Sequence, residues 1–207
     1  ELLLQIYGYG GPADDPYPSV VITADRKTVS PGRWTKLSAV MTVTAARHAE
    51  SGYYDYTVTV GNDVYTLSHV RGLSSVQIMP QEAYSSATPR PDLYLDTFLM
   101  KNTAPPAPAQ PLPTGHTGAP DTEEFEGNLI NNSGFETDLF ADSLQVGLWF
   151  TNGSSYGVEQ VPSYSHSGGH SARIYNRRSA GDTLLYRVEG NSLQLDTPYT
   201  LSGHAAA

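Results

Sequence analysis

The chain has 207 residues, of which 16% are charged, compared with roughly 25% in average globular proteins. Glycine (19) and proline (15) are frequent, and tyrosine (14) far outnumbers phenylalanine (5). This composition argues against a helical bundle and against wholesale disorder, and it favours an all-β domain with many turns. The net charge of −9 argues against nucleic acid as a partner, no apolar run is long enough to insert into a membrane, and the lack of cysteine excludes disulfides.

Strands are predicted along most of the chain, because apolar and polar residues alternate between turn signals. The alternation is strictest at 54–60, and the turn that follows predicts a hairpin with 64–67. The strands predicted in the first part of the chain are 2–9, 19–24, 34–44, 54–60, 64–67, 76–79 and 92–100. Those predicted in the second part are 128–130, 144–151, 157–161, 171–175, 183–188 and 199–205.

A proline-rich segment at 103–124 separates these two parts. Six of the fifteen prolines lie between Thr103 and Pro120, and no residue there is charged. Such a segment is typical of an extended, semi-rigid linker. The acidic group that follows is interpreted as a solvated flank; it consists of Asp121, Glu123, Glu124 and Glu126.

Short motifs in the second part resemble a known family. The sequence NLINNSGFE at 128–136 resembles the opening strand of carbohydrate-binding modules of the 4/9/22 group, which are jelly-roll β-sandwiches. Trp149 fits the early tryptophan of that family. SYSHSGGHSARI at 163–174 and YTLSGHA at 199–205 resemble its next turn and its mid-domain strand.

The motifs of the family's second half stand at the other end of this chain. PGRWTKLS at 31–38 is similar to one of its inner strands, and DLYLDTFL at 92–99 resembles its closing strand. The resemblance therefore implies a jelly-roll β-sandwich with its halves in permuted order. Residues 1–102 would be the C-terminal half, 103–124 the linker, and 125–207 the N-terminal half.

Three arrangements would complete such a sandwich. The chain could close on itself as a circular permutant, residues 125–207 could complete a neighbouring chain, or the sequence could be one period of a tandem array. Closure within one chain needs only about 4–6 linking residues, whereas the linker could extend over roughly 70 Å. We therefore expect copies of the unit to be joined head to tail, and a head-to-tail contact that does not close generates a filament.

The resemblance also implies a structural Ca²⁺ ion near the terminal strands, held by carboxylate and carbonyl oxygens. Glu136, from the GFE motif, and Asp96, from the LYLD motif, stand at the matching positions. Because they belong to opposite halves of the chain, the ion would also join the halves. The alternative is two surface carboxylates without a metal.

Exposed aromatic rings with polar neighbours are typical of glycan sites. Two of the candidates, at positions 54 and 56, lie two residues apart and so share one face of a sheet. Trp34 is instead expected in the core, and core packing is the alternative for every candidate. The candidate glycan-binding residues are Tyr54, Tyr56, Trp149, Tyr156 and Tyr164.

No motif of nucleophilic, phosphate-binding or glycosidase chemistry stands out in the sequence, so an enzyme is not expected. We expect a non-catalytic extracellular unit with a structural or adhesive role, linked head to tail to copies of itself. The alternative is a glycan-binding module of a larger polysaccharide-active or adhesion protein, with a polysaccharide as its partner.

Overall fold

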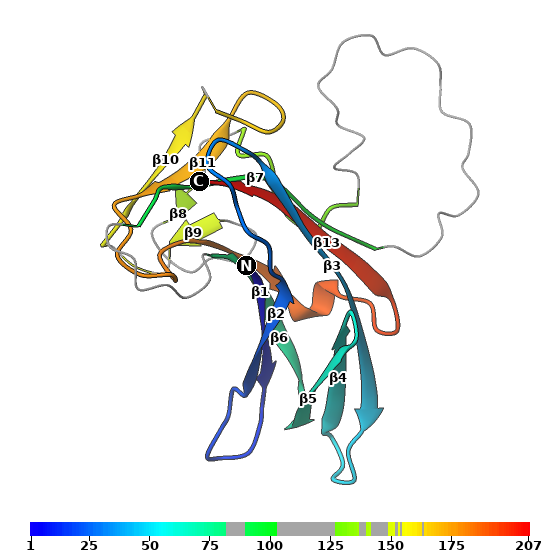
Figure 1. Cartoon of the computed structure of the whole chain (residues 1–207). Coiled ribbons are helices and arrows are strands. Elements are labelled where there is room, and N and C mark those ends of the chain that lie inside the picture. Colours follow the sequence, from blue (N-terminus) through cyan, green and yellow to red (C-terminus); the bar gives the residue numbers. More distant parts are fainter. Residues whose placement is uncertain are drawn as a thin grey trace, which may run out of the picture.

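The molecule is a sandwich of two β-sheets around one core (Figure 1). The computed structural model describes the chain except for residues 82–89, 103–126, 137–139, 142–148, 152, 154 and 163. The described part contains no α-helix, and therefore no helix that could cross a membrane. The predicted all-β sandwich is confirmed, while the predicted linker and acidic flank lie outside the described residues.

The strands follow one another with a single short 3₁₀ turn, η2 (Gly190–Ser192). The strands of the first part are β1 (Leu2–Tyr9), β2 (Ser19–Asp25), β3 (Thr35–Arg47), β4 (Tyr54–Val60), β5 (Asp63–Val70), β6 (Gly72–Pro80) and β7 (Leu93–Asn102). Those of the second part are β8 (Phe140–Ala141), β9 (Trp149–Thr151), β10 (Gly157–Val161), β11 (Ser171–Tyr175), β12 (Leu184–Glu189) and β13 (Pro198–Ala206).

Both sheets combine strands from the two parts of the chain. The six-stranded sheet has the order β2-β1-β6-β12-β9-β8, and the seven-stranded sheet has the order β10-β11-β7-β13-β3-β4-β5. Strand β13 lies between β7 and β3 and pairs antiparallel with both. The pairings of the described strands are antiparallel except at the β8–β9 edge.

One chain therefore closes its own sandwich. Strand β12 pairs with β6, and β11 pairs with β7, so neither sheet needs a strand from a neighbouring chain. The linker length favoured completion by a neighbour, but the structure has the closed arrangement. Head-to-tail association of complete units stays a prediction.

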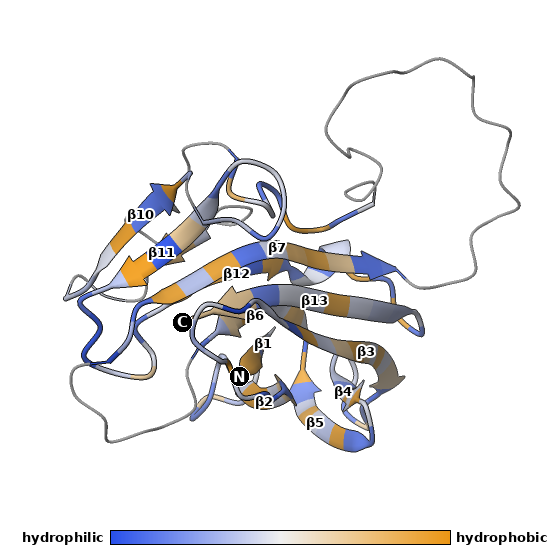
Figure 2. Ribbon diagram, turned by 45° about the horizontal axis from the view of Figure 1, so that its top comes forward, coloured by the Kyte–Doolittle hydropathy of each residue, from blue (hydrophilic) through white to orange (hydrophobic). Residues whose placement is uncertain are grey.

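The core follows from the alternation along each strand, which Figure 2 shows as alternating hydropathy. Along β1, Leu2, Leu4 and Ile6 are fully buried, while the residues between them point away from the core. Every second residue of β1 thus packs against the seven-stranded sheet, as expected for a sandwich.

Aromatic rings from both parts of the chain meet at the centre of the core. The Trp149 ring lies 5.3 Å from Phe98, 4.9 Å from Phe135 and 5.2 Å from Tyr186, measured between ring centres. Aromatic contacts at these distances add to the stabilisation from buried area. The two halves therefore share one core.

Residues 128–130 form no strand, contrary to the prediction. Asn128 instead binds β7 through its side chain: its Oδ1 accepts the backbone N–H of Met100 at 2.7 Å, and its Nδ2 donates to the Phe98 carbonyl at 3.1 Å. The Leu129 N–H also donates to the Met100 carbonyl. An asparagine side chain can offer the donor and acceptor of a backbone, and here it replaces strand pairing.

Candidate functional site

Asp96 of β7 is buried beneath the 164–170 loop. Its Oδ2 accepts the backbone N–H groups of His166 at 2.7 Å and Ser167 at 3.0 Å, and its Oδ1 accepts the Thr97 hydroxyl at 3.1 Å. Burial raises the pKa of Asp96, and these hydrogen bonds only partly oppose the rise. The three donors are neutral, so the buried carboxylate would gain from a nearby cation.

Glu136 holds the same loop from the second part of the chain. Its Oε1 accepts the backbone N–H groups of Gly169 at 2.9 Å and His170 at 3.2 Å, and its Oε2 lies 3.0 Å from His170 Nδ1. Burial alone would raise the pKa of Glu136, but these hydrogen bonds outweigh it and the pKa lies below its usual value. A Cβ at Gly168, where φ is +62°, would overlap the Glu136 carboxylate.

The two predicted metal ligands both lie near Gly134. A Cβ at Gly134 would be 3.8 Å from Asp96 Oδ1 and 3.8 Å from Glu136 Oε1. The hydroxyls of Thr97 and Ser167, 2.5 Å apart, lie beside Asp96. Oxygen donors of this kind suit Ca²⁺, although the described residues contain no group of three or more acidic or histidine side chains arranged around a metal.

Two of the predicted sugar-binding rings are buried. Trp149 is 1% exposed and Tyr56 is 9% exposed, and both belong to the core. A buried ring cannot stack on a sugar, so these two predictions are wrong. Tyr54 is half-buried, with its ring 6.2 Å from that of Tyr56. Tyr156 is also half-buried, and its hydroxyl donates to the Thr183 carbonyl at 2.5 Å.

Trp34, expected in the core, is half-exposed and belongs to an aromatic cluster. Its ring stacks on Tyr164 at 5.2 Å, and the Tyr164 ring meets the edge of Tyr94 at 4.9 Å. His166 stacks on His204 of β13 with 3.6 Å between ring centres. These contacts fasten the 164–170 loop to the seven-stranded sheet, which is a structural role for Tyr164.

The outer face of the six-stranded sheet carries polar rows that the sequence reasoning missed. Gln5 of β1 pairs with Gln77 of β6, and Gln77 pairs with Arg187 of β12. Their neighbours along each strand are in the core, so these side chains face away from it. A second row runs beside the first, and together they make the polar face, which consists of Gln5, Tyr7, Ser75, Gln77, Arg187 and Glu189.

The polar face is buried at its centre, while Gln5, Tyr7 and Arg187 are half-buried and Glu189 is exposed. Ser75 is 0% exposed and Gln77 is 8% exposed. Within the described part of the chain, the buried atoms Ser75 Oγ and Arg187 Nε have no hydrogen-bond partner. Burial raises the pKa of Tyr7, and the charge of Arg187 opposes the rise. Buried polar atoms without partners are costly, and a bound ligand would satisfy them.

An apolar strip adjoins the polar face. Leu3 pairs with Met79, and Leu185 pairs with Phe150, all at positions that point away from the core. Leu185 and Phe150 are each 5% exposed and stand outside the main core cluster. The outer face thus places a few hydrogen-bonding groups beside apolar surface, which is typical of small-ligand and cofactor sites.

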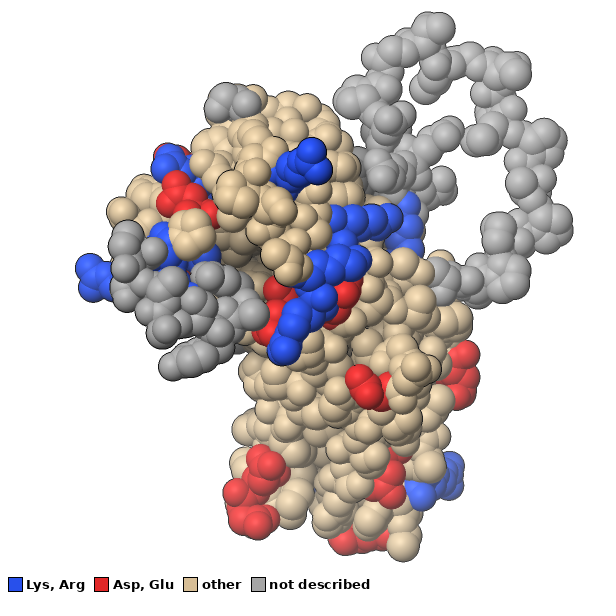
Figure 3. Space-filling model, viewed as in Figure 1, with Lys and Arg blue, Asp and Glu red and all other residues tan. Residues whose placement is uncertain are grey.

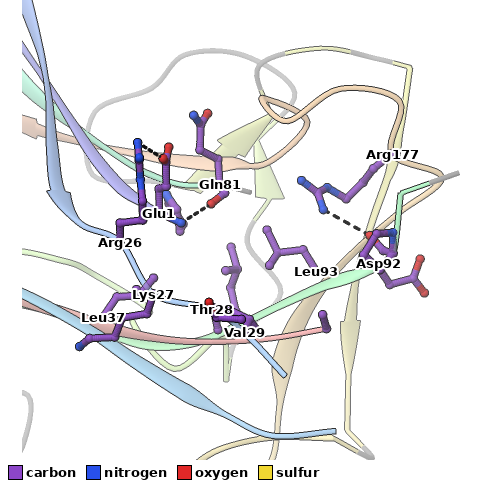
Figure 4. Close-up of a pocket in the computed structure, with 15 residues that line it drawn as sticks. Glu1, Arg26, Lys27, Thr28, Val29, Leu37, Gln81, Asp92, Leu93 and Arg177 are labelled. Carbon is purple, nitrogen blue, oxygen red and sulfur yellow. Dashed lines mark hydrogen bonds and ion pairs between the residues drawn. The ribbon is translucent and has the colours of Figure 1, made fainter. Parts of the chain in front are cut away.

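A cavity of about 590 Å³ opens at the end of the sandwich, where Val29, Leu37 and Leu93 line it (Figure 4). Its charged groups are already engaged. Glu1 pairs with Arg26. In the view of Figure 3, basic and acidic side chains lie next to one another in the middle of the molecule. This cavity is therefore a weaker candidate for a binding site than the polar face.

Comparison with protein-family models, with curated proteins and with solved structures finds no match for this chain. What the chain can do is therefore inferred from its own residues and their geometry.

Proposed function

We propose that the chain is a non-catalytic glycan-binding unit of an extracellular protein and that it binds a polysaccharide on the polar face. The observation that carries the proposal is the row Gln5–Gln77–Arg187, set in register across three strands next to buried polar atoms without partners. Glutamine amides and the arginine guanidinium can donate hydrogen bonds to neighbouring hydroxyls of a sugar, and the glutamine carbonyl oxygens can also accept them.

A neutral polysaccharide fits this face best. The chain carries a net charge of −9, which repels a polyanion. The polar face itself carries one cationic side chain, Arg187, and one anionic side chain, Glu189, in neighbouring rows. Leu3 and Met79, the half-buried residues of the adjoining apolar strip, suit the C–H faces of sugar rings, while the rows supply the hydrogen bonds that orient them.

This role is better supported than the head-to-tail structural unit that the sequence favoured. Strand exchange was favoured because the linker is longer than closure within one chain needs, but the chain completes both sheets itself. Head-to-tail association would now join whole sandwiches and would be compatible with glycan binding.

Affinity electrophoresis through gels that contain neutral polysaccharides tests the proposal. The wild-type chain should be retarded by at least one of them. Gln5→Ala should weaken binding about fivefold, because one hydrogen bond contributes about 1 kcal/mol, and Arg187→Ala should weaken it more than tenfold because its bonds are charged. Gln194→Ala and Arg33→Ala, which change exposed residues of the same types elsewhere, should bind like the wild type.

Two results would count against the proposal. If none of the polysaccharides retards the chain, the proposed glycan binding is wrong. If the variants and their controls lose the same amount of affinity, the polar face is not the binding site. Release of reducing sugar by the pure chain would contradict the non-catalytic part.

We also propose that a structural Ca²⁺ ion binds between Asp96 and Glu136, as the resemblance implies and the donor types allow. The ion would neutralise two carboxylates that now accept only hydrogen bonds from the 164–170 loop and its neighbours. The protein's own contribution is to hold these two carboxylates, from opposite parts of the chain, near Gly134.

A further inference from the structure

A second cluster of ionisable side chains lies at the opposite edge of the seven-stranded sheet from β10. His48 follows the end of β3, and His69 lies near the end of β5. Their rings are stacked with centres 4.8 Å apart and planes inclined by 27°. Both side chains are about one-third exposed, so a solute can reach them.

A β-bulge directs His69 into this cluster. Tyr54 pairs with Val70 and Tyr56 pairs with Leu67, so two residues of β5 oppose one residue of β4. His69 takes a φ of +56°, which is uncommon for a residue other than glycine. Bulges re-aim side chains, and backbone strain of this kind gathers at functional sites.

A carboxylate holds one nitrogen of each imidazole. His48 Nδ1 lies 3.1 and 3.2 Å from the two oxygens of Asp55, and His69 Nε2 lies 3.0 Å from Glu50. Asp55 also accepts the His69 backbone N–H at 3.0 Å. With the proton of each neutral ring on the nitrogen that faces a carboxylate, His48 Nε2 and His69 Nδ1 keep their lone pairs.

We propose that His48 and His69 together bind one divalent transition-metal ion of the Zn²⁺ and Cu²⁺ class, a role beyond glycan binding. Metal-binding histidines characteristically donate their second nitrogen to a carboxylate, as both do here. With metal–nitrogen bonds of about 2 Å, two imidazoles on one ion have ring centres about 5 Å apart. The observed centre separation of 4.8 Å is close to this value, whereas the 3.6 Å stack of His166 and His204 is too close. The rings must turn out of their stacked arrangement on binding, because the lone pair of an imidazole lies in the plane of its ring.

The site would be open rather than enclosed. Among the described residues no three acidic or histidine side chains surround a common metal position, so water would fill the remaining coordination positions. A cavity of about 380 Å³ lined by His48, Ser51 and Tyr53 gives access to one member of the pair. Tyr53 packs on the other ring, 4.1 Å from His69 between centres, and Arg71 lies over Tyr53.

Titration of the full chain with Zn²⁺ by calorimetry, and with Cu²⁺ by electron paramagnetic resonance, tests this site at neutral pH. We expect one ion per chain and a Cu²⁺ spectrum that shows two imidazole nitrogens. His48→Ala and His69→Ala should each weaken binding at least tenfold, and Asp55→Asn should weaken it about 10- to 100-fold. The control His166→Ala, in the other stacked pair, should leave affinity unchanged.

His48→Gln serves as a second variant if His48→Ala does not fold, because its amide can still donate to Asp55. It too should lose metal affinity. Binding of no ion, a spectrum with a single nitrogen, or a loss that appears in His166→Ala but not in His48→Ala would overturn the proposal. Glycan retardation of the same variants is measured separately, so failure of one proposal does not decide the other.

Discussion

Gly203 of β13 lies where a side chain would collide with the core. A Cβ at this position would overlap the Phe98 ring of β7, with Cζ only 2.6 Å away. Phe98 is fully buried, and its ring packs against Trp149. Gly203→Ala therefore probes the contact between a strand of the second part of the chain and a strand of the first.

The expected loss in the free energy of unfolding on Gly203→Ala follows from the rigidity of this region. Adding a methyl group to a well-packed core costs about 1–3 kcal/mol. Here the ring that must move is enclosed by other aromatic rings, so we expect a cost of about 2–3 kcal/mol. With a urea m-value of about 2 kcal/mol/M, the unfolding midpoint should fall by about 1 M.

Urea unfolding followed by tryptophan fluorescence measures the effect. Gly153→Ala is the matched control, because its Cβ would meet only Tyr156 at an ordinary 3.6 Å. In a Phe98→Leu background, Gly203→Ala should cost less, since the clashing ring is gone. A midpoint that does not change, or an equal cost in both backgrounds, would refute the packing of β13 on β7.

Three further outcomes follow from the same structure. Burial lowers the pKa of His204 to about 4. The stabilising contribution of the neutral ring is therefore fully present above about pH 6.5 and is lost as the pH falls toward 4. In urea titrations at different pH values, His204→Gln should remove about 1–2 kcal/mol of this pH dependence, allowing for the partial exposure of the ring. Saturating Ca²⁺ should raise the thermal midpoint by about 5 °C in the wild type and not in Glu136→Gln. Glu1 and Ala207 line one cavity, so a permuted chain running 127–207 then 1–102, joined by a short linker, should unfold cooperatively with an unchanged far-ultraviolet spectrum.

Local pattern predicted most of the strands. The alternation at 54–60 corresponds to β4, and the predicted 157–161 and 171–175 correspond to β10 and β11. The difficult region was 68–90, where β6 runs from Gly72 to Pro80 although only 76–79 was predicted. Residues 75–78 alternate between polar and apolar, but Leu73 and Ser74 break this pattern next to an irregularity in the pairing with β1, between Tyr7 and Gly8.

The candidate site was only partly predictable because it depends on distant pairings. Glu136 and Asp96 came from motifs, and both lie near Gly134. Gln5, Gln77 and Arg187 each look like ordinary outward polar residues, and only the register of three strands from two parts of the chain lines them up. Similarly, the sequence around Trp149 does not show that rings from three other segments enclose it.

Amide chemical-shift mapping with a soluble neutral oligosaccharide tests most directly that the outer face of the six-stranded sheet is the binding surface. The account predicts that the largest shifts occur in β1, β6 and β12, at Gln5, Gln77 and Arg187. Shifts confined to the seven-stranded sheet, or no shifts with any oligosaccharide whose polymer retards the chain, would contradict it.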